Sequence, residues 1–188
     1  KNGARYLGFG RFAGIIGCYN SLALLENFVK NAQLPRAFEI NNYKSLNEII
    51  KKKKFSKTRI LITGDGRVAK GALELLKLTN IKQVTKNDFL KKKFEFPVFC
   101  NLETSDYIES HSKEKFNLKD FIKNQKKYRS IADEYLKEAS ILISAHYWDP
   151  NSPKIFELEN LKDYKQIKVI GDITCDINGS IPTTLKST

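Results

Sequence analysis

The sequence predicts an α/β fold, a doubly wound, mainly parallel sheet with helices on both faces, preceded by a long helix. Three observations lead to this prediction. Short β-branched runs alternate with segments of helical spacing from residue 58 onward. A glycine-rich turn joins the first of these runs directly to a helical segment. A helical pattern also fills residues 11–31, before the first run begins.

Length and composition restrict the class of protein. The chain has 188 residues, of which 41% are hydrophobic and 29% are charged. This is enough for one domain with a substantial core, and it excludes a disordered chain or a disulfide scaffold. Apolar runs of about 18 residues, which a membrane span requires, are absent from the sequence.

The net charge of +12 first suggests a nucleic-acid-binding module, an interpretation that the lysine runs at 51–57 and 90–94 favour. Only six of the 33 basic residues are Arg, however, whereas nucleic-acid recognition relies on Arg. The charge therefore indicates compositional bias, and we expect no nucleic-acid and no membrane partner. A basic nucleic-acid module stays the alternative from another functional class.

Three widely spaced cysteines and two histidines give no metal-ligand spacing, so no metal site is predicted. We expect Cys18, Cys100 and Cys175 to be reduced thiols in apolar surroundings, and the protein to be cytoplasmic.

The helical segments have recognisable boundaries. Gly14 and Gly17 lie in the first helix, at positions where small residues let another element pass close by. Ser45 and Glu48 have the spacing of a capping box at the start of a second helix. Further helices are predicted from Val68 to Leu78, over 130–139, and from Ser152-Pro153 onward.

The β-branched runs predict five strands, the first of which is fully buried. They cover residues 59–63, 82–85, 97–102, 141–145 and 167–173, and a Lys-rich connection containing His111 follows the third. Strands that alternate with helices imply right-handed crossovers and a sheet covered on both faces.

The turn after the first strand reads G-x-G-x-x-A, from Gly64 to Ala69. Gly64 permits the tight turn, Gly66 removes a side chain where a pyrophosphate approaches the backbone, and Ala69 lets the helix pack on the strand. In this strand–turn–helix setting the motif predicts a Rossmann-type dinucleotide site.

The fingerprint also requires an acidic ribose ligand at the end of the second strand, about 20 residues on. That position falls on Val84, Thr85 and Lys86, and the nearest acid, Asp88, comes slightly late. Lys86 there would suit a 2′-phosphate, so the cofactor is NAD or NADP.

Five segments together resemble the lysine-forming saccharopine dehydrogenases, members of the wider alanine dehydrogenase and transhydrogenase superfamily. They are GFGRFAG (8–14), LPRAF (34–38), ITGDGRVAKGA (62–72), ISAHYWDP (143–150) and GDITCDINGSIPTT (171–184). The resemblance covers nearly the whole chain.

The resemblance implies a domain plan for residues 1–188. Residues 1–56 would hold the crossing helix and a second helix, 57–173 the Rossmann core, and 174–188 the start of a return segment. A first residue Lys1 and the absence of Met agree with a fragment of a two-domain enzyme. Its N-terminal substrate domain, with the family's Lys and His acid–base pair, would be missing, so the fragment would bind dinucleotide weakly and be inactive.

The resemblance also implies roles for individual residues. Arg5 would face the substrate, and Asp172 and Asp176 would be the acidic pair beside the nicotinamide and the reaction centre. The cofactor would be held by the turn, by Lys86, by Asp172, and by the segment bordering the nicotinamide ribose: Gly64, Gly66, Arg67, Val68, Ala69, Ser144, Ala145 and His146. The alternatives are purely structural roles: Asp172 and Asp176 would cap turns, and His146 would belong to an aromatic cluster.

The implied reaction converts saccharopine, NAD(P) and water into lysine, 2-oxoglutarate and NAD(P)H. An alanine dehydrogenase-like enzyme is the nearest alternative, since the substrate would be set by the missing domain. A catalytically silent dinucleotide sensor is a further one.

Overall fold

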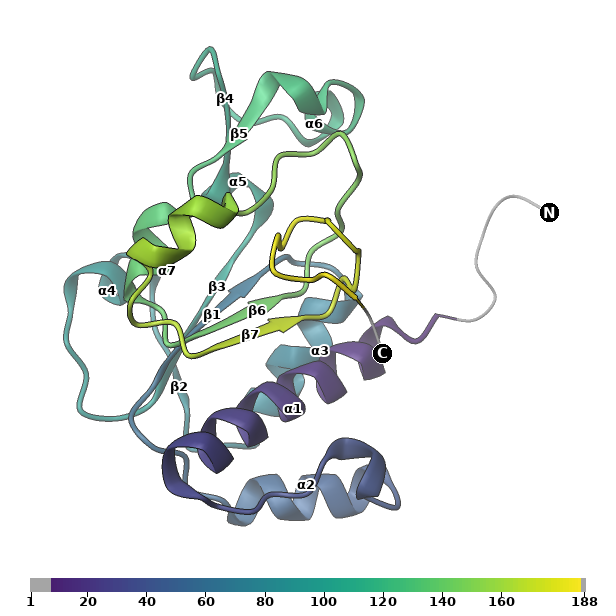
Figure 1. Ribbon diagram of the computed structural model, residues 1–188, viewed down its shortest axis with the longest axis vertical. Coiled ribbons are helices and arrows are strands. Elements are labelled where there is room, and N and C mark those ends of the chain that lie inside the picture. Colours follow the sequence, from purple (N-terminus) through teal and green to yellow (C-terminus); the bar gives the residue numbers. More distant parts are fainter. Residues whose placement is uncertain (1–7, 187–188) are drawn as a thin grey trace.

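The computed structural model describes residues 8–186, which form a five-stranded and a two-stranded sheet with surrounding helices (Figure 1). The α-helices are α1 Gly10–Lys30, α2 Tyr43–Lys52, α3 Arg67–Leu76, α4 Lys86–Lys91, α5 Thr104–Tyr107, α6 Leu118–Lys123 and α7 Asp133–Glu138. The strands are β1 Arg59–Thr63, β2 Lys82–Gln83, β3 Val98–Leu102, β4 Ile108–Ser110, β5 Tyr128–Ser130, β6 Ile141–Ser144 and β7 Val169–Asp172. Short 3-10 helices span Ala37–Glu39, Gln125–Lys127 and Leu158–Asp163.

The larger sheet has the strand order β2-β3-β1-β6-β7, and all of its pairings are parallel. Alternate side chains of β1 enter different cores. Ile60 and Ile62 pack with α1, α2 and α3, whereas Leu61 packs on the opposite side with residues of α4 and α7. Figure 1 shows these two helical layers on either side of the sheet. The predicted fold class is therefore confirmed.

The first turns of α1 and α3 cross in backbone contact. A Cβ atom added at Gly14 would overlap the carbonyl oxygen of Val68, and one added at Gly71 would overlap the carbonyl oxygen of Arg11. The prediction that small residues of the first helix admit another element is thus confirmed, and that element is α3. The Arg11 guanidinium of α1 also forms an ion pair with the Glu74 carboxylate of α3, with Nη2 and Oε1 2.5 Å apart.

A buried carboxylate holds the far end of α1. Glu26 is 1% exposed, accepts the backbone N–H of Ser56 at 3.0 Å, and pairs with Lys53 at 3.0 Å. Burial alone would raise the pKa of Glu26, but the hydrogen bonds from Ser56 and Lys53 prevail and lower it. One lysine of the run at 51–54 therefore has a structural role.

Two predicted helix starts are wrong. Asn42, not Ser45, caps α2, and its side-chain oxygen accepts the backbone N–H of Ser45 at 3.0 Å. Residues 128–130 form β5 instead of leading into a helix, because they pair antiparallel with β4. The Ser130 hydroxyl donates to the Ile155 carbonyl at 2.7 Å, and α7 begins only at Asp133.

The helix predicted from Ser152-Pro153 is absent. Asp149 accepts the backbone N–H of Asn151 and makes a local turn, after which the Ile155 N–H donates to the Ser180 carbonyl. The second strand is also shorter than predicted, since Thr85 caps α4. Cys18 and Cys100 are buried as expected, whereas Cys175 is exposed, contrary to the prediction.

We expect Gly14→Ala to lower the free energy of unfolding by about 2 kcal/mol, because the new methyl group would force α1 away from the α3 backbone. The thermal midpoint, followed by circular dichroism, should fall by about 4–8 °C. Gly66→Ala is the matched control, since a Cβ there meets no atom within 4 Å. Equal midpoints for the two variants would contradict the close contact.

Candidate dinucleotide site

The carboxyl ends of four neighbouring strands lie in one row. Leu102, Thr63, Ser144 and Asp172 are register partners across β3, β1, β6 and β7. After β1 the chain continues toward the β2 edge of the sheet, and after β6 it continues toward the β7 edge. The strand order therefore reverses between β1 and β6. Ligands of open α/β sheets bind in the crevice at such a point. This row therefore marks the candidate site.

Of the two glycines in the predicted turn, the fold requires a glycine at Gly64 but not at Gly66. Gly64 has φ +107°, and a Cβ on it would lie 2.8 Å from the Ala145 carbonyl oxygen. Gly66 has an ordinary φ of −76° at the N-cap of α3, and a Cβ on it would meet nothing within 4 Å. The packing and the backbone thus explain Gly64 but not Gly66, which faces open space beside the free N–H groups of a helix start.

A cleft that we call the α1 cleft lies between the start of α1, the glycine turn and the loop after β7. Arg67 and Val68 come from the turn, Ala145 from the end of β6, and Asp176 from the last loop. Ala69, by contrast, is fully buried beneath the turn, as its packing role predicts. Gly66 and His146 line it as well, so the structure brings six of the predicted site residues to one cleft.

Asp172 is occupied by its own loop. One carboxylate oxygen accepts the backbone N–H of Thr174 at 3.1 Å and its hydroxyl at 2.6 Å, and the other accepts the Thr184 hydroxyl at 2.6 Å. These bonds hold the segment 172–184 in place. Of the two predicted acidic residues, Asp176 is the one that lines the cleft.

His146 is held at the centre of the row. Its Nδ1 lies 2.8 Å from the Thr63 hydroxyl, and the Ser144 hydroxyl lies 3.5 Å away. Burial lowers the pKa of His146 to about 4, although the charge of Asp172 acts in the opposite direction. The imidazole is therefore neutral at physiological pH, with Nε2 buried and unpaired in the described structure.

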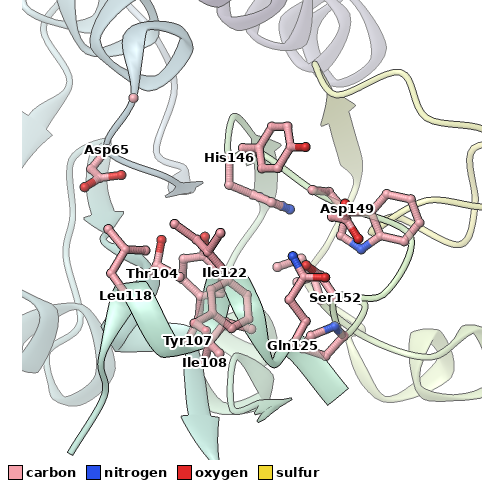
Figure 2. A pocket seen from close by; sticks show the side chains of 16 residues that line it. Asp65, Thr104, Tyr107, Ile108, Leu118, Ile122, Gln125, His146, Asp149 and Ser152 are labelled. Carbon is pink, nitrogen blue, oxygen red and sulfur yellow. The ribbon is translucent and has the colours of Figure 1, made fainter. Parts of the chain in front are cut away.

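A second concavity, the α6 cavity, lies on the other side of the glycine turn. It has a volume of about 300 Å³ and is bounded by α5, α6 and the loop 146–155 (Figure 2). Asp65 and Gly66 form its border with the turn, and His146 and Trp148 line both this cavity and the α1 cleft. The two spaces thus adjoin across Gly66.

Glu103 is a candidate ribose ligand that the sequence prediction did not name. Because β3, not β2, lies next to β1, the acid that follows the neighbouring strand is Glu103, which is exposed. The signal was an acidic residue directly after the third predicted strand. Lys86, predicted to lie at a strand end, begins α4 and pairs with Asp106 at 2.6 Å; its pKa is raised mainly by that hydrogen bond.

One predicted site residue lies outside the described part of the chain. Arg5 lies outside the described residues 8–186. Within that range no group of three or more His, Cys, Asp or Glu side chains is arranged to hold a metal ion. No described helix has both the length and the apolar character needed to cross a membrane.

Comparisons with known proteins give a distant relative and no family assignment. No protein-family model matches the sequence. The chain is 26% identical over 149 residues to the alpha-aminoadipic semialdehyde synthase of Arabidopsis thaliana, a match covering 68% of this chain and 14% of that protein. A solved structure of L-alanine dehydrogenase aligns with 96% of this chain and 42% of its own, at 15% identity and a TM-score of 0.43.

We expect His146→Gln to flatten the pH dependence of stability between pH 7.5 and 5. His146 titrates near 6.5 in the unfolded chain and at about 4 in the fold. The unfolded state therefore binds more protons in this window, and stability falls as the pH drops, by about 2 kcal/mol at pH 5. Urea unfolding at several pH values measures this loss. An identical slope in the variant would contradict a buried neutral imidazole.

Proposed function

We propose that this chain is the nucleotide-binding part of an NAD-dependent amino-acid dehydrogenase. The observation that carries the proposal is Gly66, whose missing side chain would otherwise occupy the open space between the two cavities. A glycine at a helix N-terminus with no steric reason in the fold suits close approach of a pyrophosphate. The bound cofactor would supply hydride transfer.

The residues present fit each part of such a cofactor. The turn from Gly64 to Ala69 would receive the pyrophosphate at the start of α3. Ala145 and Asp176 in the α1 cleft would border the nicotinamide half. Because Asp172 is engaged within its loop, we assign it a positioning role and leave the cleft-facing charge to Asp176.

Glu103 favours NAD over NADP. It follows the strand next to β1, the place from which an acid binds the ribose 2′-hydroxyl in dinucleotide-binding sheets. A carboxylate there repels a 2′-phosphate, and the charge of nearby Lys86 is already paired with Asp106. These two observations support a preference for the unphosphorylated cofactor.

For the substrate we propose an amino acid with a secondary amine, saccharopine being the first candidate. The support is the five-segment resemblance together with the plant relative, whose name denotes synthesis of an amino-acid semialdehyde. Alanine is the alternative substrate. Measuring NADH production by the full-length protein separates them, and turnover of alanine without turnover of saccharopine would overturn this assignment.

The first test is a titration of the chain with NADH, followed by energy transfer from Trp148, the single tryptophan, to the nicotinamide. We expect saturable binding that Gly66→Ala weakens by tenfold or more, about 1.4 kcal/mol, because the methyl group enters the pyrophosphate space. Lys70→Ala, on an exposed position of α3, is the control. Binding that is absent up to millimolar NADH would refute the proposed function.

A second test concerns the choice between the two cofactors. Glu103→Gln should weaken NADH binding by about tenfold, because the ribose 2′-hydroxyl loses a hydrogen bond to a charged acceptor. NADPH binding should stay equal or become stronger, because the carboxylate that repels the 2′-phosphate is gone. Asp88→Asn is the matched control, since Asp88 lies on α4 and pairs with Lys92 at 3.0 Å. A changed preference in Asp88→Asn alone would instead place the ribose at the second strand.

A further inference from the structure

One side of α1 exposes apolar side chains along most of the helix. They recur at every fourth residue and therefore lie on one face, with a single polar member in the middle. We call this face the α1 stripe, and its members are Phe12, Ile16, Asn20, Leu24 and Phe28. The opposite side of α1 packs on α3, β6 and β7. A helix that is apolar on nearly every side is normally covered on every side, so the α1 stripe indicates a contact surface.

The α1 stripe also differs from the rest of the chain in charge. The net charge is +12 and 29% of all residues are charged, yet no charged residue occurs in the segment 12–25. The next charged residue, Glu26, is buried and paired with Lys53. Two copies of so basic a chain repel each other wherever their lysines meet, and they approach most easily at a face that carries none. The charge distribution therefore favours the α1 stripe as a face for self-association.

The exposed apolar area is sufficient for a dimer. The Ala37 N–H donates to Asn20 Oδ1 at 3.1 Å, so the exposed Phe38 follows directly beside the middle of the stripe. With Phe38 included, the α1 stripe presents about 600 Å² of apolar surface, at the upper end for a monomer. A stable interface buries about 800 Å² on each partner, and between identical subunits about 65% of this is apolar, or about 500 Å².

The pattern of the α1 stripe reads alike in both directions. Phenylalanines stand at its two ends, branched aliphatic residues lie four positions inward, and Asn20 is the centre. A two-fold axis at Asn20 places Phe12 beside Phe28 of a second copy and Ile16 beside Leu24, so that side chains of matching size meet. Rows of side chains with a spacing of four pack together when two helices cross at about 50°. The two Asn20 amides at the axis would fix the register, as a single buried Asn does in coiled coils.

We propose that two copies of this chain associate through the α1 stripe as a two-fold symmetric pair of antiparallel helices. The occupant is a second copy because the face is uncharged in a basic chain, large enough for a dimer, and complementary to itself when reversed. The dimer needs no bound cofactor, so this inference stands independently of the proposed function.

Sedimentation of the full-length protein tests the surface. We expect a dimer, and Leu24→Glu should raise its dissociation constant at least a hundredfold, because each dimer loses two buried leucines and gains two buried carboxylates. Leu158→Glu is the matched control, since Leu158 is 53% exposed against 57% for Leu24 and lies outside the α1 stripe. A monomeric parent protein, or a dimer that Leu24→Glu leaves intact, would overturn the proposal.

A thiol at the centre of the stripe tests the symmetry and identifies the occupant. In a Cys175→Ser background, which removes the exposed native thiol, Asn20→Cys should be joined to its counterpart by a short bismaleimide. Lys70→Cys, at an exposed position of α3, is the control and should stay unlinked. Two outcomes would overturn the second copy as occupant. A new thiol that reacts freely in a monomer means an uncovered face, and one that is protected in a monomer means that another part of the same chain covers it.

Discussion

The contact between α1 and α3 through Gly14 and Gly71 is the constraint on which the rest of the structure depends. It brings two helix backbones together near the start of α3, so that the glycine turn has a fixed position relative to Phe9 and Gly10. A larger residue at either glycine would separate the helices and open the α1 cleft on that side. The same contact covers one face of the sheet, and its packing thereby serves both stability and the site.

The in-register strand ends give the site its order. The Thr63 hydroxyl, at the end of β1, is hydrogen-bonded to Nδ1 of His146, which lies 83 residues further along the chain. This bond fixes the orientation of the imidazole at the strand ends. Burial of the ring disfavours its protonated form and lowers the pKa of His146. A neutral, oriented side chain at the centre of the row is suited to recognition of a ligand by hydrogen bonds rather than by charge.

Sequence reasoning predicts the strands of the large sheet and the glycine turn, because these depend on local spacing and on the conformational freedom of Gly64. It cannot say which strand lies beside β1, because tertiary packing decides this. In the structure β3 lies between β1 and β2, and the acid that follows β3 is Glu103, the residue we propose for the ribose. The turn at Asp149 replaces a predicted helix, and the cap at Asn42 moves the start of another, so short polar side chains decide both boundaries. The bond from the Thr174 N–H to Asp172 agrees with the turn-capping alternative, whereas the bond from the Thr184 hydroxyl joins residues too far apart for local sequence to predict.

The antiparallel pair β4–β5 joins the two ends of the segment 111–127. Residues 111–127 leave and return at adjacent points, since the His111 N–H donates to the Lys127 carbonyl, and between them lies α6 with its share of the cavity wall. Such a segment is modular, because its two ends are already joined and the large sheet takes no strand from it. An insertion or deletion between residues 111 and 127 would therefore reshape one wall of the α6 cavity and leave the large sheet and the glycine turn in place.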